Sequence, residues 1–227
     1  FIMAETEVKK SAGTKLNAFL EKNRKAVLVS FLVIIIALIA FISISVISSK
    51  NAEKDIARID EISFSMTNNS ATLEQTELDT RASTALEALK PFLKKNGIAG
   101  VRANMLAAEI AFLQKDYESA INYWDATFAK GKKVYTAPLA LYNKAVCLEQ
   151  LGKTEDAAKL YKDAAEYEDF VLASHALFNY ARVLETLGNY TEAVAAYKEV
   201  SDKYPSDKWA NLAKTRVIAL QVENKAE

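Results

Sequence analysis

The stretch "LGNYTEAVAAYKEVSDKYP", residues 187–205, has the pattern of a helix end, a tight turn and a second helix that a proline stops. Gly188 suits the left-handed backbone that often ends a helix. Asn189 followed by Glu192 is typical of a capping box at the start of the next helix. The stretch therefore predicts an antiparallel helical hairpin, with the small Ala193 at the point where its two helices cross.

The same skeleton occurs twice upstream, in "LGKTEDAAKLYKDA" (151–164) and "KDYESAINYWDATF" (115–128), where Lys115 replaces the turn glycine. Two columns of alanine and one of large aromatic residues recur every 36 or 37 positions: Ala108, Ala145 and Ala181; Ala120, Ala157 and Ala193; Trp124, Tyr161 and Tyr197. Repeats of this length are typical of helical solenoids, in which each hairpin packs on the next.

These columns resemble the tetratricopeptide repeat, which pairs small residues at the helix crossing with a turn glycine and a later aromatic. The resemblance implies an all-α fold, a right-handed α-solenoid of helical hairpins. It predicts three repeats, at about 101–137, 138–173 and 174–205. A looser helical pair is expected in residues 50–100, and a capping helix in 206–227 that closes the array.

A single apolar run precedes the repeats. Residues 26–49, "AVLVSFLVIIIALIAFISISVISS", contain no charged side chain. As a helix they would be about 36 Å long, more than the ~30 Å hydrocarbon core of a bilayer. The run also exceeds the ~7–15 apolar residues of a signal peptide, and no convincing cleavage site follows it. The sequence therefore predicts one permanent transmembrane anchor near the amino terminus.

Charge on either side of this run predicts its orientation. Six basic residues precede it and three follow within a comparable distance: Lys9, Lys10, Lys15, Lys22, Arg24 and Lys25, against Lys50, Lys54 and Arg58. Basic flanks remain on the cytoplasmic side of a membrane. The expected arrangement is a cytoplasmic basic tail (1–25) and an exported repeat domain.

The layout as a whole resembles the YfgM-like family of bacterial inner-membrane proteins, most specifically at the junction "FLEKNRKAVLVSFLVIIIALIAF", residues 19–41. That resemblance implies a periplasmic repeat domain with the Sec translocon and periplasmic chaperones as partners. The alternative is a membrane-anchored receptor for protein import or complex assembly whose repeats face the cytosol.

Catalysis is not expected from this sequence. The chain has one histidine, His175, and one cysteine, Cys147, so clusters of nitrogen or sulfur metal ligands are excluded. No catalytic constellation surrounds His175, and Cys147 between two apolar residues is typical of a buried thiol. Basic and acidic residues balance at 29 each, which gives no charge-based indication of nucleic-acid binding. We expect no enzyme activity, no cofactor, no metal and no nucleic-acid partner.

In tetratricopeptide arrays the first helices of the hairpins line a concave groove that binds proteins or extended peptides. The corresponding positions here are Met105, Leu106 and Glu109 in the first repeat. In the later repeats they give the candidate binding residues Tyr142, Asn143, Val146, His175, Phe178, Asn179 and Arg182. Asn143 and Asn179 lie in one column, and amide side chains can both donate to and accept from a peptide backbone. The alternative is that Tyr142 and Phe178 pack against neighbouring helices.

Overall fold

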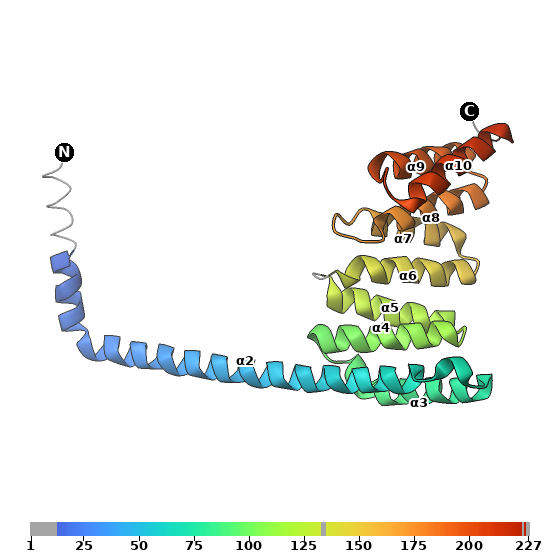
Figure 1. The fold of residues 1–227 in the computed structure, drawn as a ribbon. Coiled ribbons are helices and arrows are strands. Elements are labelled where there is room, and N and C mark those ends of the chain that lie inside the picture. The colour runs from blue at the N-terminus through green and yellow to red at the C-terminus, as the bar shows by residue number, and fades with distance from the viewer. Residues whose placement is uncertain (1–12, 133–134, 224, 226–227) are drawn as a thin grey trace, which may run out of the picture. The chain divides into compact units, whose positions relative to one another are not determined.

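The computed structural model describes residues 13–132, 135–223 and 225, and every regular element among them is a helix. The chain divides into two compact units, residues 1–52 and 53–227, and each is described by itself. Stacked helical hairpins follow one long apolar helix (Figure 1). The predicted fold class is therefore confirmed.

The described part of the first unit consists of helical segments. Residues 13–22 are helical, and α2, Arg24–Thr67, begins directly afterwards. The apolar part of α2 has a mean hydropathy of 3.3 in its most apolar window of 18 residues, none of which is buried. By length and composition this helix can cross a membrane. Two of the basic residues counted above, Lys9 and Lys10, lie outside the described residues.

The helix does not end where the apolar run ends. The sequence predicted an anchor that stops at Ser49 and a separate helix after it, but α2 continues without a break to Thr67. No glycine or proline occurs between Arg24 and Thr67, so nothing in the backbone interrupts the helix at the change from apolar to charged residues. The carboxyl-terminal part of α2 belongs to the second unit.

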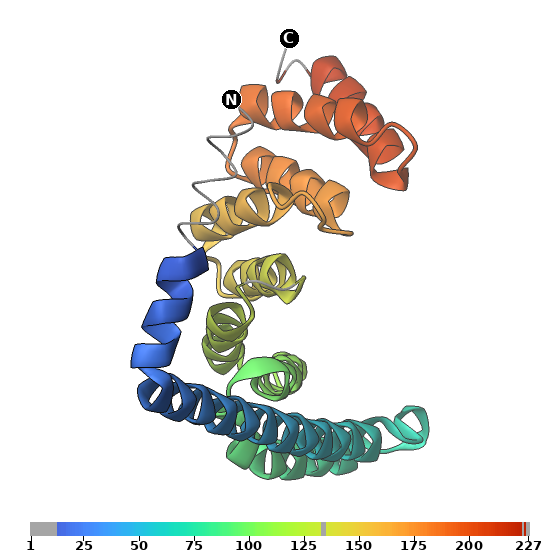
Figure 2. The same cartoon turned by 90° about the vertical axis from the view of Figure 1, so that its left-hand side faces the viewer.

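The second unit is a stack of antiparallel helices, which Figure 2 shows in order from α3 to α10. After the short helix η1 (Ser70–Thr72) the elements are α3 (Gln75–Leu93), α4 (Gly97–Leu113), α5 (Tyr117–Gly131), α6 (Thr136–Gln150), α7 (Thr154–Ala165), α8 (Ala173–Thr186), α9 (Tyr190–Lys203) and α10 (Lys208–Val222). Each of α4–α5, α6–α7 and α8–α9 is a hairpin with one turn of the repeated type.

The repeated columns form the core of these hairpins. All six alanines are fully buried: Ala108, Ala120, Ala145, Ala157, Ala181 and Ala193. The aromatic column is buried as well, with Trp124 at 3% exposure and Tyr161 and Tyr197 at 1% each. Small side chains let paired helices approach closely, and the large aromatic rings fill the space that remains beside them.

The hairpin turns share one backbone conformation. Gly152 and Gly188 have φ angles of 72° and 79°, and Lys115 adopts 61° at the equivalent position. In each turn the N–H of the following residue donates to the carbonyl five residues earlier, at 2.9 Å: Asp116 to Ala111, Lys153 to Leu148 and Asn189 to Leu184. This bond is the signature of a Schellman ending, which satisfies a carbonyl that the helix end leaves free.

The predicted capping box at Asn189 is wrong. Asn189 precedes α9 as expected, but its side chain makes no capping hydrogen bond and stays exposed. Backbone hydrogen bonds already close this turn, so the amide is left in solvent. Asp116 provides the side-chain cap in the first repeat, where its carboxylate accepts from the N–H of Ser119 at 3.1 Å.

Replacing Lys115 by glycine should stabilise the protein. A side chain in the left-handed region costs roughly 1–2 kcal/mol, which the added freedom of glycine in the unfolded chain offsets in part. We expect Lys115→Gly to gain about 0.5–1 kcal/mol, seen as a higher urea midpoint. Gly152→Ala is the converse control: no atom lies within 4 Å of the added Cβ, so it should lose stability through backbone strain alone. A loss of stability in Lys115→Gly would contradict this account.

The ends of the stack differ from each other. Ala85 and Leu89 of α3 pack with Ile59 and Ile62 of α2, in a pair that lacks the alanine columns of the later hairpins. At the other end, α10 was expected to be a solvating cap. Its inner face is buried, but the outer face leaves large apolar side chains exposed: Leu212 at 49%, Ile218 at 61% and Val222 at 77%.

Candidate functional site

The candidate site is the row of side chains on the first helices of the three hairpins, which we call the inner row. It comprises Arg102, Met105, Leu106 and Glu109 on α4, Tyr142, Asn143 and Val146 on α6, and His175, Phe178, Asn179 and Arg182 on α8. The structure divides this row into two parts. Side chains of α6 and α8 bind one another, whereas those of α4 line an open pocket with α2.

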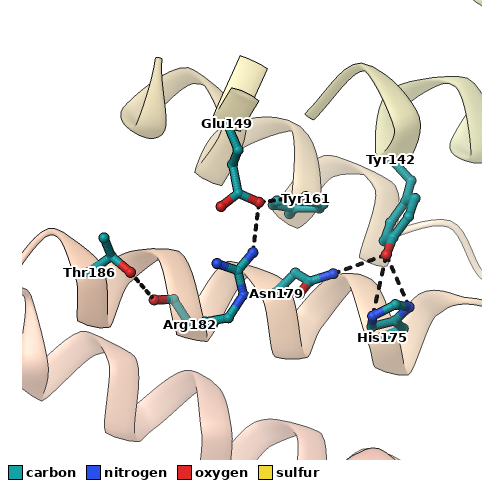
Figure 3. A network of polar contacts seen from close by, with 7 residues as sticks. All are labelled: Tyr142, Glu149, Tyr161, His175, Asn179, Arg182 and Thr186. Carbon is teal, nitrogen blue, oxygen red and sulfur yellow. Dashed lines mark hydrogen bonds and ion pairs between the residues drawn. The ribbon is translucent and has the colours of Figure 1, made fainter. Parts of the chain in front are cut away.

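A polar cluster around the Tyr142 hydroxyl joins α6 to α8 (Figure 3). This oxygen lies 3.0 Å from His175 Nδ1 and accepts from Asn179 Nδ2, also at 3.0 Å. Tyr142 and Asn179 are both buried, and burial raises the pKa of the Tyr142 phenol. Buried polar groups need such partners, so this cluster fixes the two helices against each other.

The aromatic side chains of α8 pack toward α9 and α10. The His175 ring stacks on Trp209 with a centroid distance of 3.9 Å and an angle of 8° between the planes. The Phe178 ring lies 5.0 Å from that of Trp209 and 5.3 Å from that of Tyr197. Packing against neighbouring helices, the alternative for Tyr142 and Phe178, is therefore what the structure has.

The two asparagines of the predicted column have different surroundings. Asn179 is buried: it donates to Tyr142 and its Oδ1 accepts from Arg182 Nε at 3.3 Å, so its amide does not face a peptide. Asn143 is half-buried and donates to the Leu139 carbonyl of its own helix at 3.0 Å. Val146 is half-buried against the core cluster that contains Tyr161. Asn143 and Val146 remain the accessible candidates on α6.

A cluster of one glutamate, one tyrosine and one arginine, which we call a Glu–Tyr–Arg cluster, links successive hairpins. It was not predicted from the sequence. Glu149 Oε2 accepts from the Tyr161 hydroxyl and from Arg182 Nη2, both at 2.7 Å (Figure 3). The arrangement recurs one repeat later, where Glu185 Oε2 accepts from the Tyr197 hydroxyl at 3.1 Å and from Arg216 Nε at 2.8 Å.

The environment of the two Glu–Tyr–Arg clusters shifts the pKa values of their side chains. Burial raises the pKa values of the Tyr161 and Tyr197 hydroxyls, while the hydrogen bond from Arg216 lowers the pKa of Glu185. The signal in the sequence was a column of two glutamates 36 residues apart, each twelve residues before a core tyrosine. The cluster of Glu149 thus pairs Arg182 within the protein, so Arg182 is not a free cation.

The open part of the inner row is a cavity of about 170 Å³ between α2 and α4, which we call the α2–α4 pocket. Its lining comprises Ile59, Asp60, Ser63, Arg102, Met105, Leu106 and Glu109. Arg102 forms an ion pair with Asp60, and Glu109 has no ion-pair partner among the described residues. The side chain of Glu109 is exposed, and the protein around it displaces only part of its water, which raises the pKa of its carboxyl.

The sequence placed Met105, Leu106 and Glu109 on the groove but assigned α2 only to a looser pair, so it did not predict this pocket. Among the described residues no group of three or more His, Cys, Asp or Glu side chains is placed to hold a metal ion. Cys147 is fully buried, and burial raises the pKa of its thiol to about 11.

His175 should make stability depend on pH. Burial first, and then the positive charges of Lys208 and Arg182, lower the pKa of His175 from its ordinary value of 6.5. The folded state therefore favours the neutral ring, and this stabilisation is present above pH 6.5 and is lost as the pH falls below it. We expect urea midpoints of the unaltered protein to fall more steeply below pH 6.5 than those of His175→Gln. Parallel curves for the two proteins would contradict the assignment.

Comparison with known proteins agrees with this architecture. A curated TPR repeat-containing protein of Treponema pallidum (strain Nichols) is 25% identical over 128 residues, which are 56% of this chain and 54% of that protein. The chain thus spans about half the length of this relative. Two crystal structures of putative kinesin light chain TPR-like repeats from Podosopora anserina are similar in fold, at 11% identity. Their TM-scores are 0.57 and 0.56, and the match covers 77% of this chain and 88% or 89% of theirs.

A family-level match covers the repeats. The tetratricopeptide repeat family matches residues 80–132, 116–169 and 150–208, in three overlapping segments that together include more than half of the chain. The matched region covers the buried alanine columns, the left-handed turns and the Glu–Tyr–Arg cluster of Glu149, whereas Arg216 of the second cluster lies beyond residue 208. The chain belongs to the tetratricopeptide repeat family.

Proposed function

We propose that this protein is a membrane-anchored scaffold that binds other proteins or extended peptides through its inner row. The observation that carries the proposal is the α2–α4 pocket, an open and chemically mixed cavity at the positions where repeats of this family present their groove. The accessible Asn143 and Val146 support it, because the buried contacts of Tyr142 and Asn179 hold α6 and α8 in place, and a preorganised surface loses little conformational entropy on binding. The exposed apolar part of α2 supports the anchor.

We infer further that the basic tail lies in the cytoplasm and the repeats in the periplasm of a bacterial cell, as an ancillary component of the Sec translocon or of envelope chaperones. The charge asymmetry around the apolar run and the resemblance to YfgM-like proteins support this placement. The alternative is a cytosol-facing receptor for protein import or complex assembly, which has the same repeats in the opposite orientation.

Protease protection separates the two orientations. In spheroplasts, protease added outside should digest the repeat domain if it is periplasmic, and disruption of the membrane should change nothing further. A repeat domain that resists external protease until the membrane is opened would favour the cytosol-facing receptor instead. Detection with an antibody against a carboxyl-terminal tag reports the fate of the repeats directly.

Site-specific photocrosslinking tests the binding surface. A photoreactive side chain at Met105 or Val146 should form discrete adducts with other proteins in cells, because both positions lie on the inner row. The matched control is Ala195, an exposed position on α9 outside that row. Adducts of equal yield from Ala195, or adducts from that position alone, would contradict binding through the inner row.

A further inference from the structure

We propose that the α2–α4 pocket binds the side chain of a lysine or arginine in the polypeptide partner. This inference rests on the proposed function and adds the chemistry of the residue that the inner row recognises. The preferred occupant is a cationic head group on an aliphatic stem. Acidic and purely apolar side chains are not preferred occupants.

The walls of the pocket suit the aliphatic stem of such a side chain. Met105 provides most of the accessible apolar surface, and a flexible methionine adapts to irregular shapes. Ile59 and Leu106 lie behind it, at 2% and 8% exposure. The volume of about 170 Å³ is well above the ~10–15 Å³ that a single water molecule needs, so the pocket has room for several heavy atoms. The side chain of lysine, with five heavy atoms, is of that size. Stem methylenes of lysine and arginine commonly lie along apolar surface while the charged end reaches a polar partner.

The charges of the pocket leave one negative group unbalanced. Asp60 and Arg102 form an ion pair with each other, so these two contribute little net charge. Glu109 has no such partner in the described part of the chain, and its carboxylate accepts no side-chain hydrogen bond there either. Partial desolvation raises the pKa of Glu109 and so disfavours its charged form. A cation within hydrogen-bond distance would reverse that penalty, which makes the pocket complementary to a positive head group.

The rest of the inner row lacks this complementarity. On α8, Arg182 is neutralised by Glu149 at 2.7 Å, and Asn179 is committed to Tyr142 and Arg182. The side chains of α6 that stay accessible, Asn143 and Val146, carry no charge. An unpaired charge therefore distinguishes the α2–α4 end, so this end should set the preference for a basic residue.

Methyl NMR of the full chain in uncharged maltoside micelles tests the pocket without knowledge of the partner. The probes are n-butylammonium and n-butylguanidinium, which reproduce the ends of lysine and arginine, with 1-butanol and butyrate as neutral and anionic controls. We expect saturable shifts of the Met105 and Ile59 methyl signals with both cations, at concentrations at least fivefold lower than 1-butanol requires. Butyrate should cause none.

Variants then assign the effect to the carboxylate. Glu109→Gln should weaken cation binding at least fivefold while 1-butanol is unaffected, and Glu192→Gln, an exposed carboxylate on α9, should leave all probes unchanged. Equal binding of butanol and the cations, no saturable shift with either cation, or a Glu109→Gln variant that binds like the unaltered protein would each overturn the proposal. Photocrosslinking from Met105 and Val146 could still succeed in those cases, which would leave the inner row as a binding surface without a basic-residue pocket.

Discussion

Trp124→Ala should destabilise the repeat domain by about 3–5 kcal/mol, the range for removing a large aromatic side chain from a core. Trp124 of α5 is 3% exposed and lies in a cluster whose other buried members are small: Ala108, Ala111, Ala120, Ala140 and Cys147. Short side chains cannot extend into the space that the indole leaves, so the cavity should persist.

Urea unfolding of the full chain in maltoside micelles, followed by far-ultraviolet circular dichroism, measures this loss. Tyr135→Ala is the control, because Tyr135 is a large aromatic residue with 76% of its surface exposed, and its removal should change the unfolding free energy by no more than about 0.5 kcal/mol. A loss below about 1 kcal/mol for Trp124→Ala would mean that the aromatic column does not hold the first two hairpins together.

Ala145→Leu should have the second largest effect, by the opposite mechanism. Ala145 of α6 is fully buried in a cluster with Ala157, Tyr161 and Ala176. Three added carbon atoms have no room at this crossing, so the helices must separate or neighbouring side chains must leave their preferred rotamers. Overpacking of this kind costs about 1–3 kcal/mol, and more where the backbone cannot move.

The same substitution on an exposed alanine separates crowding from intrinsic helix propensity. Ala195→Leu on α9 places the identical side chain in solvent, and it should change the unfolding free energy by at most about 0.5 kcal/mol. Equal effects at the two positions would show that Ala145 does not lie at a close helix crossing.

The helical hairpins could be predicted from the sequence because their geometry depends on residues close together along the chain. Alanine at a fixed spacing sets how closely two helices pack, and a glycine such as Gly188 permits the turn between them. The helix continues past Ser49, where the apolar run ends, for a physical reason as well. A change from apolar to charged residues marks where the surroundings of the helix change. It does not end the helix, because α2 contains no Gly or Pro there.

The candidate site was less predictable, because its contacts join different repeats. Whether the amide of Asn179 faces a peptide or the Tyr142 hydroxyl depends on how α8 is rotated about its axis relative to α6. The spacing of the repeated residues along the sequence does not determine that rotation. The α2–α4 pocket depends on the approach of α2, whose part in the array carries no repeat signature. Glu149 and Glu185 did form a visible column, and only the identity of their partners required coordinates.

The two Glu–Tyr–Arg clusters affect how the repeat array unfolds. Glu149 holds Tyr161 of its own hairpin and Arg182 of the next, and Glu185 repeats this with Tyr197 and Arg216 of α10. Detachment of α10 would therefore leave the partly buried carboxylate of Glu185 without its arginine partner, and it would also expose apolar surface. Fraying from the carboxyl-terminal end should be suppressed, and melting should spread over several hairpins at once instead of proceeding one by one.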